Sequence, residues 1–410
     1  MQITLPYGLE AYWTLATTGQ NITRVGPSAS LVPLADPALS VRTALRDPLD
    51  YPPLASATVP GDKVVVTIPA GMPEVESLAR GVLQALLDAG VEPAQLALLV
   101  ADEATEQTLR ACQQSLALDH PWLHEVRIVV HDPRAADACG LVGVTRTGRP
   151  LRMNRLICEA DLLVPMGIVS AAVDMGEEKP PLLTGLFPDF ADKDALGRFF
   201  APSSRDNRVH RSRRLEEIDE ASWLLAGGMV VQVVPASQGK VAALFAGYPA
   251  SVAAAAWQAC LASWTPAISN RGDLAVCLLT GSAAAQSWSG IGRAIQAAEA
   301  VLEAGGTVVL CSELEQSPGF SLGRLCQQDD RVSRQHEIMR DREADSWPAL
   351  QLSRALQRGS VYLHSRLENS VVENLGMAPI ASNAELSRLI TRHTHIIVLD
   401  DAQWLVPVVR

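Results

Sequence analysis

Few side chains that could do chemistry lie close together in this sequence, and the loop over residues 174–179 contains several of them. Its carboxylates, Asp174, Glu177 and Glu178, could bind a hard cation through oxygen, although three carboxylates in a loop are usually only solvated. Lys179 follows them and could be modified or contact a ligand, and the alternative is an ordinary surface lysine. This loop is therefore the first candidate for a functional site.

A short apolar run, Leu162 to Pro165, leads into this loop from the polar residues before it. The run ends at Gly167, and the glycines and prolines beyond it cannot continue a regular element. We expect a buried strand that delivers a functional loop at its carboxyl end, where open α/β sheets bind their ligands.

Three further side chains could bind a substrate. Arg293 lies near the expected start of a helix, where a guanidinium could clamp a carboxylate, and the alternative is an arginine on a solvated helix face. Asn207 and His210 form the short motif Asn207-x-x-His210, and a role in binding is implied only by the family resemblance given below. The residue types favour a structural hydrogen-bonding pair.

A basic cluster lies between residues 205 and 214, and it could receive a phosphate. Its members are Arg205, Arg208, Arg211, Arg213 and Arg214. Acidic residues follow directly at positions 216, 217, 219 and 220, so the cluster also reads as one half of a mixed, solvated surface, which is the favoured interpretation.

Two glycine patterns and three histidines carry weaker signals. Gly290 and Gly292 begin a dinucleotide fingerprint, but Ile295 replaces its third glycine. The loop at Gly281 lacks the lysine and the spacing of a phosphate-binding loop. We interpret the remaining histidines on expected elements as core or surface residues: His364, His393 and His395.

Composition and charge set outer limits on the function. A chain of 410 residues is too long for one ordinary core, so we expect two domains. The net charge of −11 disfavours nucleic acid as a partner, because phosphate contacts need a basic face. No apolar run is long enough to span a membrane, and the N-terminal residues do not form a secretory signal, so we expect a cytoplasmic protein. The seven cysteines are dispersed without a CxxC pair, which favours reduced thiols.

The first half of the chain alternates strand and helix patterns. We expect buried strands at 62–68, 96–100 and 126–131, with amphipathic helices at 76–89 and 105–116 between them. This order predicts an α/β fold with a parallel sheet. The same half should continue with a hairpin turn at 143–148, a helix at 215–225, a strand at 229–234 and a helix at 250–263.

The second half restarts this alternation after a likely boundary, which Pro266 and Gly272 mark. It should contain strands at 274–279, 307–310, 360–363 and 396–399, and helices at 292–304, 348–358 and 382–392. A charged helix is expected within 327–347, and Gly305-Gly306 should end the helix that precedes it.

Taken in order, these elements and several short motifs resemble the nickel-dependent lactate racemase family. Members of this family use a nickel-pincer nucleotide, a nicotinic-acid-derived cofactor tethered to a lysine, to racemise or epimerise 2-hydroxy acids. The motifs are Asp62-Lys-Val-Val-Val, Val129-Val-His-Asp, Asn154-Arg155 with Glu159-Ala-Asp161, Gly167, Asn207-x-x-His210, Phe245-Ala-Gly, Glu303-Ala-Gly-Gly-Thr-Val-Val and the closing segment 391–409.

The resemblance implies two α/β domains that face each other across a cleft. On this basis we expect an N-terminal domain over 1–264 that the closing segment 396–410 rejoins, and a C-terminal α/β domain over 270–395. The linker at 264–273 should then act as a hinge between the two.

The chain departs from the family at the positions that do its chemistry. The arginine of the first ligand loop falls on Ala70, and the two catalytic histidines fall near Ala101 and on Ala172. Lys179 lies within a residue of the cofactor-bearing lysine, but its surroundings are changed. A further nickel-ligand histidine has no counterpart near 199–202, whereas Arg293 falls where the family has a substrate-contacting lysine.

Two functions follow from this mixture of matches and losses. The favoured one is a non-racemising paralogue with an eroded nickel-pincer site that binds a small acid or a nucleotide, or regulates a partner. No cofactor is expected in that case, and a homo-oligomer or a partner protein is compatible with it. The alternative is a 2-hydroxy-acid racemase, epimerase or related isomerase with a site rebuilt around Lys179, Arg293 and His210, which would retain the nickel-pincer nucleotide.

Overall fold

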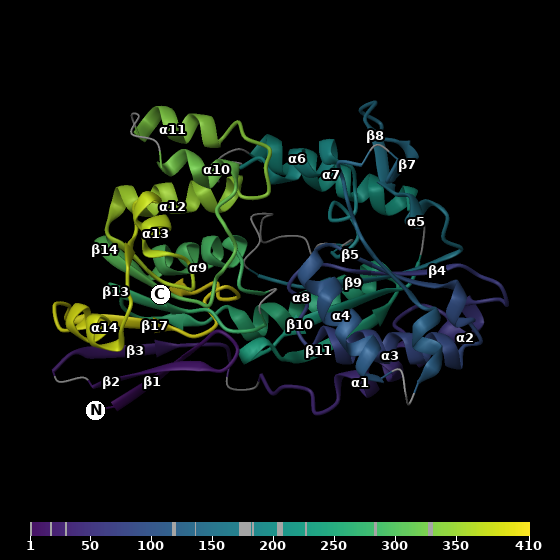
Figure 1. Ribbon diagram of the computed structural model, residues 1–410, viewed down its shortest axis with the longest axis horizontal. Helices are drawn as coiled ribbons and strands as arrows, with labels where there is room; N and C mark the ends of the chain where they lie inside the picture. The colour runs from purple at the N-terminus through teal and green to yellow at the C-terminus, as the bar shows by residue number, and fades with distance from the viewer. Residues whose placement is uncertain are drawn as a thin grey trace.

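The computed structural model describes residues 2–16, 19–28, 31–116, 120–135, 137–171, 182, 184–202, 208–225, 228–282, 285–326 and 331–410. Within these residues the chain forms two six-stranded sheets and three two-stranded pairs, with helices on the faces of both large sheets (Figure 1). This is the α/β fold that the alternating pattern predicts, and both faces of each large sheet are covered by apolar clusters.

The first sheet has the strand order β11-β10-β9-β4-β5-β6. Its strands are β4 (Val64–Ile68), β5 (Leu96–Val100), β6 (Arg127–Val130), β9 (Leu162–Ile168), β10 (Val230–Pro235) and β11 (Val241–Gly247). All neighbours are parallel except β10 and β11. The prediction that the strands near 63–68, 96–100 and 126–131 are neighbours is confirmed, because β5 pairs with β4 on one side and β6 on the other.

Helices cover both faces of this sheet. On one face lie α1 (Pro37–Arg46), α3 (Val75–Asp88) and α4 (Glu103–Leu116), whose buried residues share one apolar cluster with the sheet. On the other face lie α6 (Lys193–Phe200), α7 (Arg208–Leu224) and the hairpin β7 (Cys139–Val144) and β8 (Pro150–Asn154), with α8 (Pro249–Trp264) over β10 and β11. Short helices α2 (Leu54–Ala57) and α5 (Arg155–Cys158) complete this half.

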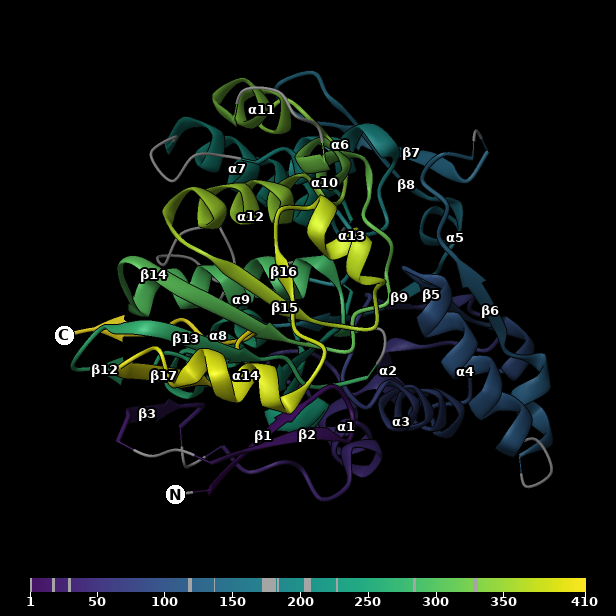
Figure 2. The ribbon, with the colours of Figure 1, turned by 60° about the vertical axis from the view of Figure 1, so that its left-hand side comes forward.

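The second sheet is entirely parallel, with the order β16-β15-β14-β13-β17-β3. Its strands are β3 (Asn21–Val25), β13 (Gly272–Leu278), β14 (Leu302–Cys311), β15 (Val361–His364), β16 (Ala378–Pro379) and β17 (His395–Leu399). One face carries α9 (Trp288–Val301) and α12 (Ser346–Arg358), and the other carries α14 (Asn383–Ile390) and the hairpin β1 (Gln2–Tyr7) and β2 (Ala11–Ala16) (Figure 2). Helices α10 (Phe320–Gly323), α11 (Arg331–Ile338) and α13 (Asn369–Asn374) lie in the connections.

The expectation that strand 396–399 packs with the N-terminal domain is wrong. It forms β17, which pairs with β13 on one side and with the edge strand β3 on the other, inside the second sheet. The reason is its apolar character on both faces: Ile397 and Leu399 face one apolar cluster, and Ile396 and Val398 face the opposite one. Such a strand needs a central position, and it is β3, from the N-terminal end, that crosses over to extend this sheet.

The segment expected to be a hinge is held at both ends. Trp264 is fully buried and donates from its indole nitrogen to the carbonyl of Pro235, 3.0 Å away. Beyond it, β12 (Ala267–Ile268) pairs with β18 (Val408–Val409) near the C-terminus. One apolar cluster also runs from Val169 and Val234 at the ends of β9 and β10, through α8, into the second sheet. This continuous core counts against a pivot at 264–273.

Other elements differ from prediction mainly at their ends. Helix α9 ends at Val301, and β14 begins at Leu302, so Gly305 and Gly306 lie within the strand segment and do not end the helix. In the described part of the charged segment 327–347, α11 spans Arg331–Ile338, and α12 begins at Ser346. None of the helices that the structure describes is long and apolar enough to cross a membrane.

Gly81 gives a direct test of how α1 crosses α3. An added Cβ there would lie 2.4 Å from Cγ1 of Val41 and 2.5 Å from the carbonyl oxygen of Ala38, both on α1. In an isolated helix alanine is favoured over glycine by about 1 kcal/mol. Here the clash with α1 outweighs that preference, and we expect Gly81→Ala to lower the free energy of unfolding by about 1–3 kcal/mol.

The matched control is Gly323→Ala in α10, where an added Cβ meets no atom within 4 Å. Chemical denaturation should place this variant within about 0.5 kcal/mol of the parent or above it. Equal or greater stability of Gly81→Ala would contradict the close crossing of α1 and α3.

Candidate functional site

The carboxyl ends of the two sheets meet at the turn between β10 and β11. This turn, Ser237–Gly239, follows the carboxyl end of β10 and reaches the loop after β13. An added Cβ on Gly239 would lie 2.7 Å from Cα of Gly281, so the two backbones touch. Because ligands of open α/β sheets bind at carboxyl ends, this junction is the candidate functional site.

The first sheet contributes few reactive groups to this edge. The loop after β4 carries Ala70, and the loop after β5 begins with Ala101, whose amide donates to the carbonyl of Ile68 at 3.1 Å. Asp102 accepts a hydrogen bond from the amide of Thr105 at 2.7 Å, so its carboxylate serves the start of α4. Alanine side chains at 70 and 101 supply neither a charge nor a proton.

His131 follows the end of β6 at this edge of the first sheet, and it is held by two hydrogen bonds. Its Nε2 lies 2.9 Å from the carbonyl of Ala191, and its Nδ1 lies 3.0 Å from the amide nitrogen of Asn154. A carbonyl can only accept, so Nε2 carries the proton and Nδ1 accepts from Asn154. The ring is buried, and loss of hydration lowers the pKa of His131 below its ordinary value. This histidine is a neutral structural group.

Close packing follows β9. An added Cβ on Gly167 would lie 2.2 Å from the carbonyl oxygen of Thr184, and Gly185 is equally tight against Met166. The hydroxyl of Thr67 on β4 donates to the carbonyl of Gly185 at 2.5 Å. Asp189 accepts from the amide of Gly185 at 3.2 Å, and burial raises the pKa of its carboxyl. The segment 184–190 therefore seals one side of the edge.

The second sheet contributes a polar group of loops at the point where its strand order reverses. From β13 the chain proceeds through β14, β15 and β16 in one direction, and then places β17 on the other side of β13. The loop after β13 carries Thr280, and the turn after β17 carries Asp401 and Gln403, all three buried. The amide nitrogen of Gln403 donates to the carbonyl of Thr280 at 2.9 Å.

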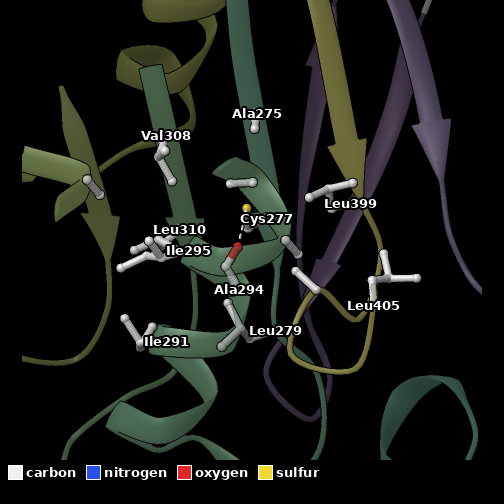
Figure 3. Packing of buried hydrophobic residues seen from close by; sticks show 14 of the residues in the cluster. Ala275, Cys277, Leu279, Ile291, Ala294, Ile295, Val308, Leu310, Leu399 and Leu405 are labelled. Carbon is white, nitrogen blue, oxygen red and sulfur yellow. Dashed lines mark hydrogen bonds between the residues drawn. The ribbon is translucent and has the colours of Figure 1, made fainter. Parts of the chain in front are cut away.

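Arg293 lies beside these loops on α9. Figure 3 shows Ile291, Ala294 and Ile295 of this helix directed at the sheet, with Sγ of Cys277 hydrogen-bonded to the carbonyl of Ala294 at 3.7 Å. The guanidinium of Arg293 lies over the ring of Trp404, with its central carbon 5.1 Å from the ring centre.

The charge of Arg293 is unbalanced in the part of the chain that the structure describes. Its Nε is enclosed and has no hydrogen-bond partner, although the side chain as a whole keeps some exposure. Burial lowers the pKa of this guanidinium to about 10, so it remains a cation at neutral pH. The arginine predicted as a carboxylate clamp is therefore half-enclosed and stacked on an aromatic ring, unlike a solvated helix arginine.

The structure does not place the other predicted site residues. Lys179, Asn207, Ala172 and the carboxylates of 174–178 lie outside the described residues, and for His210 only its place in α7 is described. In the basic cluster, Arg214 donates to the carbonyls of Arg198 and Ala201, and it lies over the ring of Phe199.

Arg213 lines a hollow of about 330 Å³ between the β7–β8 hairpin and α7. The other residues that line it are Thr145, Thr147, Arg149, Glu216, Glu217 and Glu220. Glu217 is buried there and bonds to Arg149 and Arg198, which agrees with the mixed-charge interpretation of this region.

Trp404, Thr280 and Asp401 were not identified from the sequence. The only signal that included two of them was the closing segment 391–409, which carried part of the family resemblance. Nothing in the residue types shows that Trp404 of this segment contacts Arg293 of α9.

Comparison with known proteins agrees with the sequence resemblance. Residues 7–176 match the family model described as the lactate racemase N-terminal domain. The lactate racemase apoprotein from Thermoanaerobacterium thermosaccharolyticum has a TM-score of 0.73 at 19% identity, covering 99% of this chain and 100% of that one. A Thermotoga maritima protein has a TM-score of 0.62 at 13% identity, covering 92% and 99%. No curated protein matches the chain in sequence.

His131 should make the protein less stable in mild acid. Below pH 6.5, the ordinary pKa of histidine, the unfolded chain takes up a proton that the folded protein refuses until lower pH. The free energy of unfolding should therefore fall as the pH drops from 7.5 to 5, by up to about 1.4 kcal/mol per pH unit for this group.

Denaturation of His131→Gln at both pH values should show a smaller fall than the parent protein. His124→Gln, which changes an exposed histidine, is the control and should follow the parent. An unchanged pH dependence in His131→Gln would show that His131 is not held neutral.

Proposed function

Because this chain is a lactate-racemase-like protein, with a lactate racemase N-terminal domain over 7–176 and the lactate racemase fold throughout, we propose that it binds small carboxylic acids. We propose further that it does so without nickel-pincer chemistry. The observation that carries this function is Arg293, a half-enclosed cation without a carboxylate partner among the described residues, at the carboxyl edge of the second sheet.

A half-enclosed guanidinium without a counterion is costly, because its enclosed Nε has lost hydration that no hydrogen-bond acceptor among the described residues replaces. A ligand carboxylate would supply both the negative charge and the acceptors for two parallel hydrogen bonds. Trp404 supports this role, because a ring beneath the guanidinium holds its plane and leaves its edge for an anion.

The residues present do not fit the nickel-pincer nucleotide. Square-planar nickel prefers thiolate or imidazole donors, and no group of three His, Cys, Asp or Glu side chains able to hold a metal occurs in the described ranges. Ala70 replaces the arginine that the resemblance assigns to substrate carboxylate and cofactor phosphate. His131 cannot serve as a substitute ligand without breaking its bonds to Asn154 and Ala191.

Racemisation is also disfavoured by the residues present. Exchanging the two faces of a 2-hydroxy acid needs a base on each face, and the resemblance places those bases near Ala101 and at Ala172. A methyl group cannot take or return a proton. We therefore propose a binding protein in which Arg293 holds the carboxylate and Trp404 orients Arg293.

Lactate is the probe that tests this function. Isothermal titration with L-lactate and D-lactate should detect binding, and Arg293→Met should weaken it by about 10- to 100-fold, the value of a charge-assisted hydrogen bond. Arg358→Met is the matched control, since it removes an exposed arginine on α12 that pairs with Glu299.

Equal lactate affinity in Arg293→Met and the parent would contradict the proposed site. Interconversion of the two enantiomers by the purified protein would instead support the isomerase with a rebuilt site.

A further inference from the structure

Asp401 is a buried carboxylate that no part of the proposed function uses. It follows β17, and the residue is only 2% exposed. Its backbone adopts a positive φ of 51°, a conformation that few non-glycine residues adopt. Burial raises the pKa of its carboxyl, so the folded protein holds this group at a cost. A cost of this kind is retained where the group has a role.

One oxygen of Asp401 joins the two sheets. Its Oδ1 accepts a hydrogen bond from the hydroxyl of Thr280, in the loop after β13 of the second sheet. The same oxygen accepts from the backbone amide of Gln238 at 3.1 Å, in the turn after β10 of the first sheet. Next to these bonds, Gly239 and Gly281 touch through their backbones, so no side chain of theirs could make the link instead.

The turn that begins at Asp401 also holds the support of Arg293. The amide of Trp404 donates to the carbonyl of Asp401 at 2.9 Å, which closes the turn. Gln403, between them, bonds to the carbonyl of Thr280, so the turn is tied twice to the same loop. The ring of Trp404 is thereby fixed where the guanidinium of Arg293 lies over it.

The neighbouring carboxylate does not compete for this role. Asp400 forms a bidentate pair with Arg24 of β3, with contacts of 2.6 and 2.9 Å. Its charge is therefore balanced within the second sheet.

We infer that Asp401 is a positioning residue: it locks the turn after β10 to the loop after β13 and thereby sets Trp404 and Arg293 for the ligand carboxylate. This inference rests on the proposed function, because it concerns the same anion site. Asp401 itself does not contact the ligand. It makes the affinity for the acid depend on how the two sheets are joined.

The test compares Asp401→Ala with the conservative Asp401→Asn. The asparagine keeps an oxygen that can accept hydrogen bonds from Thr280 and Gln238, whereas the alanine has no hydrogen-bond acceptor in its side chain. Isothermal titration with L-lactate should show affinity weakened about tenfold or more in Asp401→Ala, as for loss of one or two hydrogen bonds, and restored to within about threefold of the parent in Asp401→Asn. Asp400→Asn is the matched control and should bind lactate like the parent.

Hydrogen exchange gives a second readout. The amide of Gln238 should exchange at least about tenfold faster in Asp401→Ala, because its acceptor is gone, while the amides of β4 keep their protection. A carboxylate that merely adds stability would change all amides together. Unchanged exchange at Gln238 would overturn the inference.

The outcomes separate this inference from the proposed function. If Arg293→Met binds lactate as the parent does, the proposed function fails. If Arg293→Met is weakened but folded Asp401→Ala binds as the parent does, only the positioning role fails. Should Asp401→Ala not fold, Thr280→Val removes the donor and keeps the branched shape, and unchanged lactate affinity in that variant would overturn the inference equally.

Discussion

The contact between Gly239 and Gly281 is the constraint on which the rest of the structure depends. Two parallel sheets each end in loops at their carboxyl edges, and here those loops touch through backbone atoms. Beneath this contact, α8 carries one apolar cluster from the first sheet into the second, with Trp264 buried at its end. Close packing of this kind leaves few alternative arrangements, so the loops that meet at the junction occupy defined positions.

That rigidity explains how an arginine remains half-enclosed without a carboxylate beside it in the described residues. Arg293 is carried by a helix whose other face is anchored in the core by Ile291, Ala294 and Ile295 (Figure 3). Its guanidinium rests on Trp404, which comes from a turn that is tied to both sheets. The fold thus holds a partly desolvated cation in place. The packing of the large core offsets the free-energy cost of that desolvation. The proposed binding of an acid at this site therefore depends on the junction between the sheets as much as on Arg293.

Some of this could be predicted from the sequence because it depends on local pattern. The β-branched run at 64–68 and the apolar stripe at 78–86 have no good alternative to a buried strand and an amphipathic helix. Strand β3 was missed because most of its side chains are partly exposed and it is short, as expected at the edge of a sheet. The place of β17 was predicted wrongly, since a strand that is apolar on both faces fits the centre of either sheet.

The site itself was only partly accessible to such reasoning. Arg293 was a candidate, but its enclosure arises from Trp404, more than a hundred residues away, and no local pattern reports that contact. Likewise, the role proposed for Asp401 depends on its bonds to Thr280 and Gln238. The three residues lie in three separate loops. The interpretations of Lys179, Asn207 and His210 stay predictions, because the described residues do not include their side chains.

The most direct test of the proposal that an anion site replaces the cofactor site is the mass and metal content of the purified protein. The protein should be produced together with the enzymes that build the nickel-pincer nucleotide, and then examined by intact mass spectrometry and elemental analysis. Alanines at 70, 101 and 172 in place of the family's arginine and catalytic histidines, together with the missing nickel-ligand histidine near 199–202, predict the unmodified mass and no stoichiometric nickel. A mass increment localised to Lys179, accompanied by one nickel per chain, would contradict the account and favour the alternative function, a 2-hydroxy-acid isomerase.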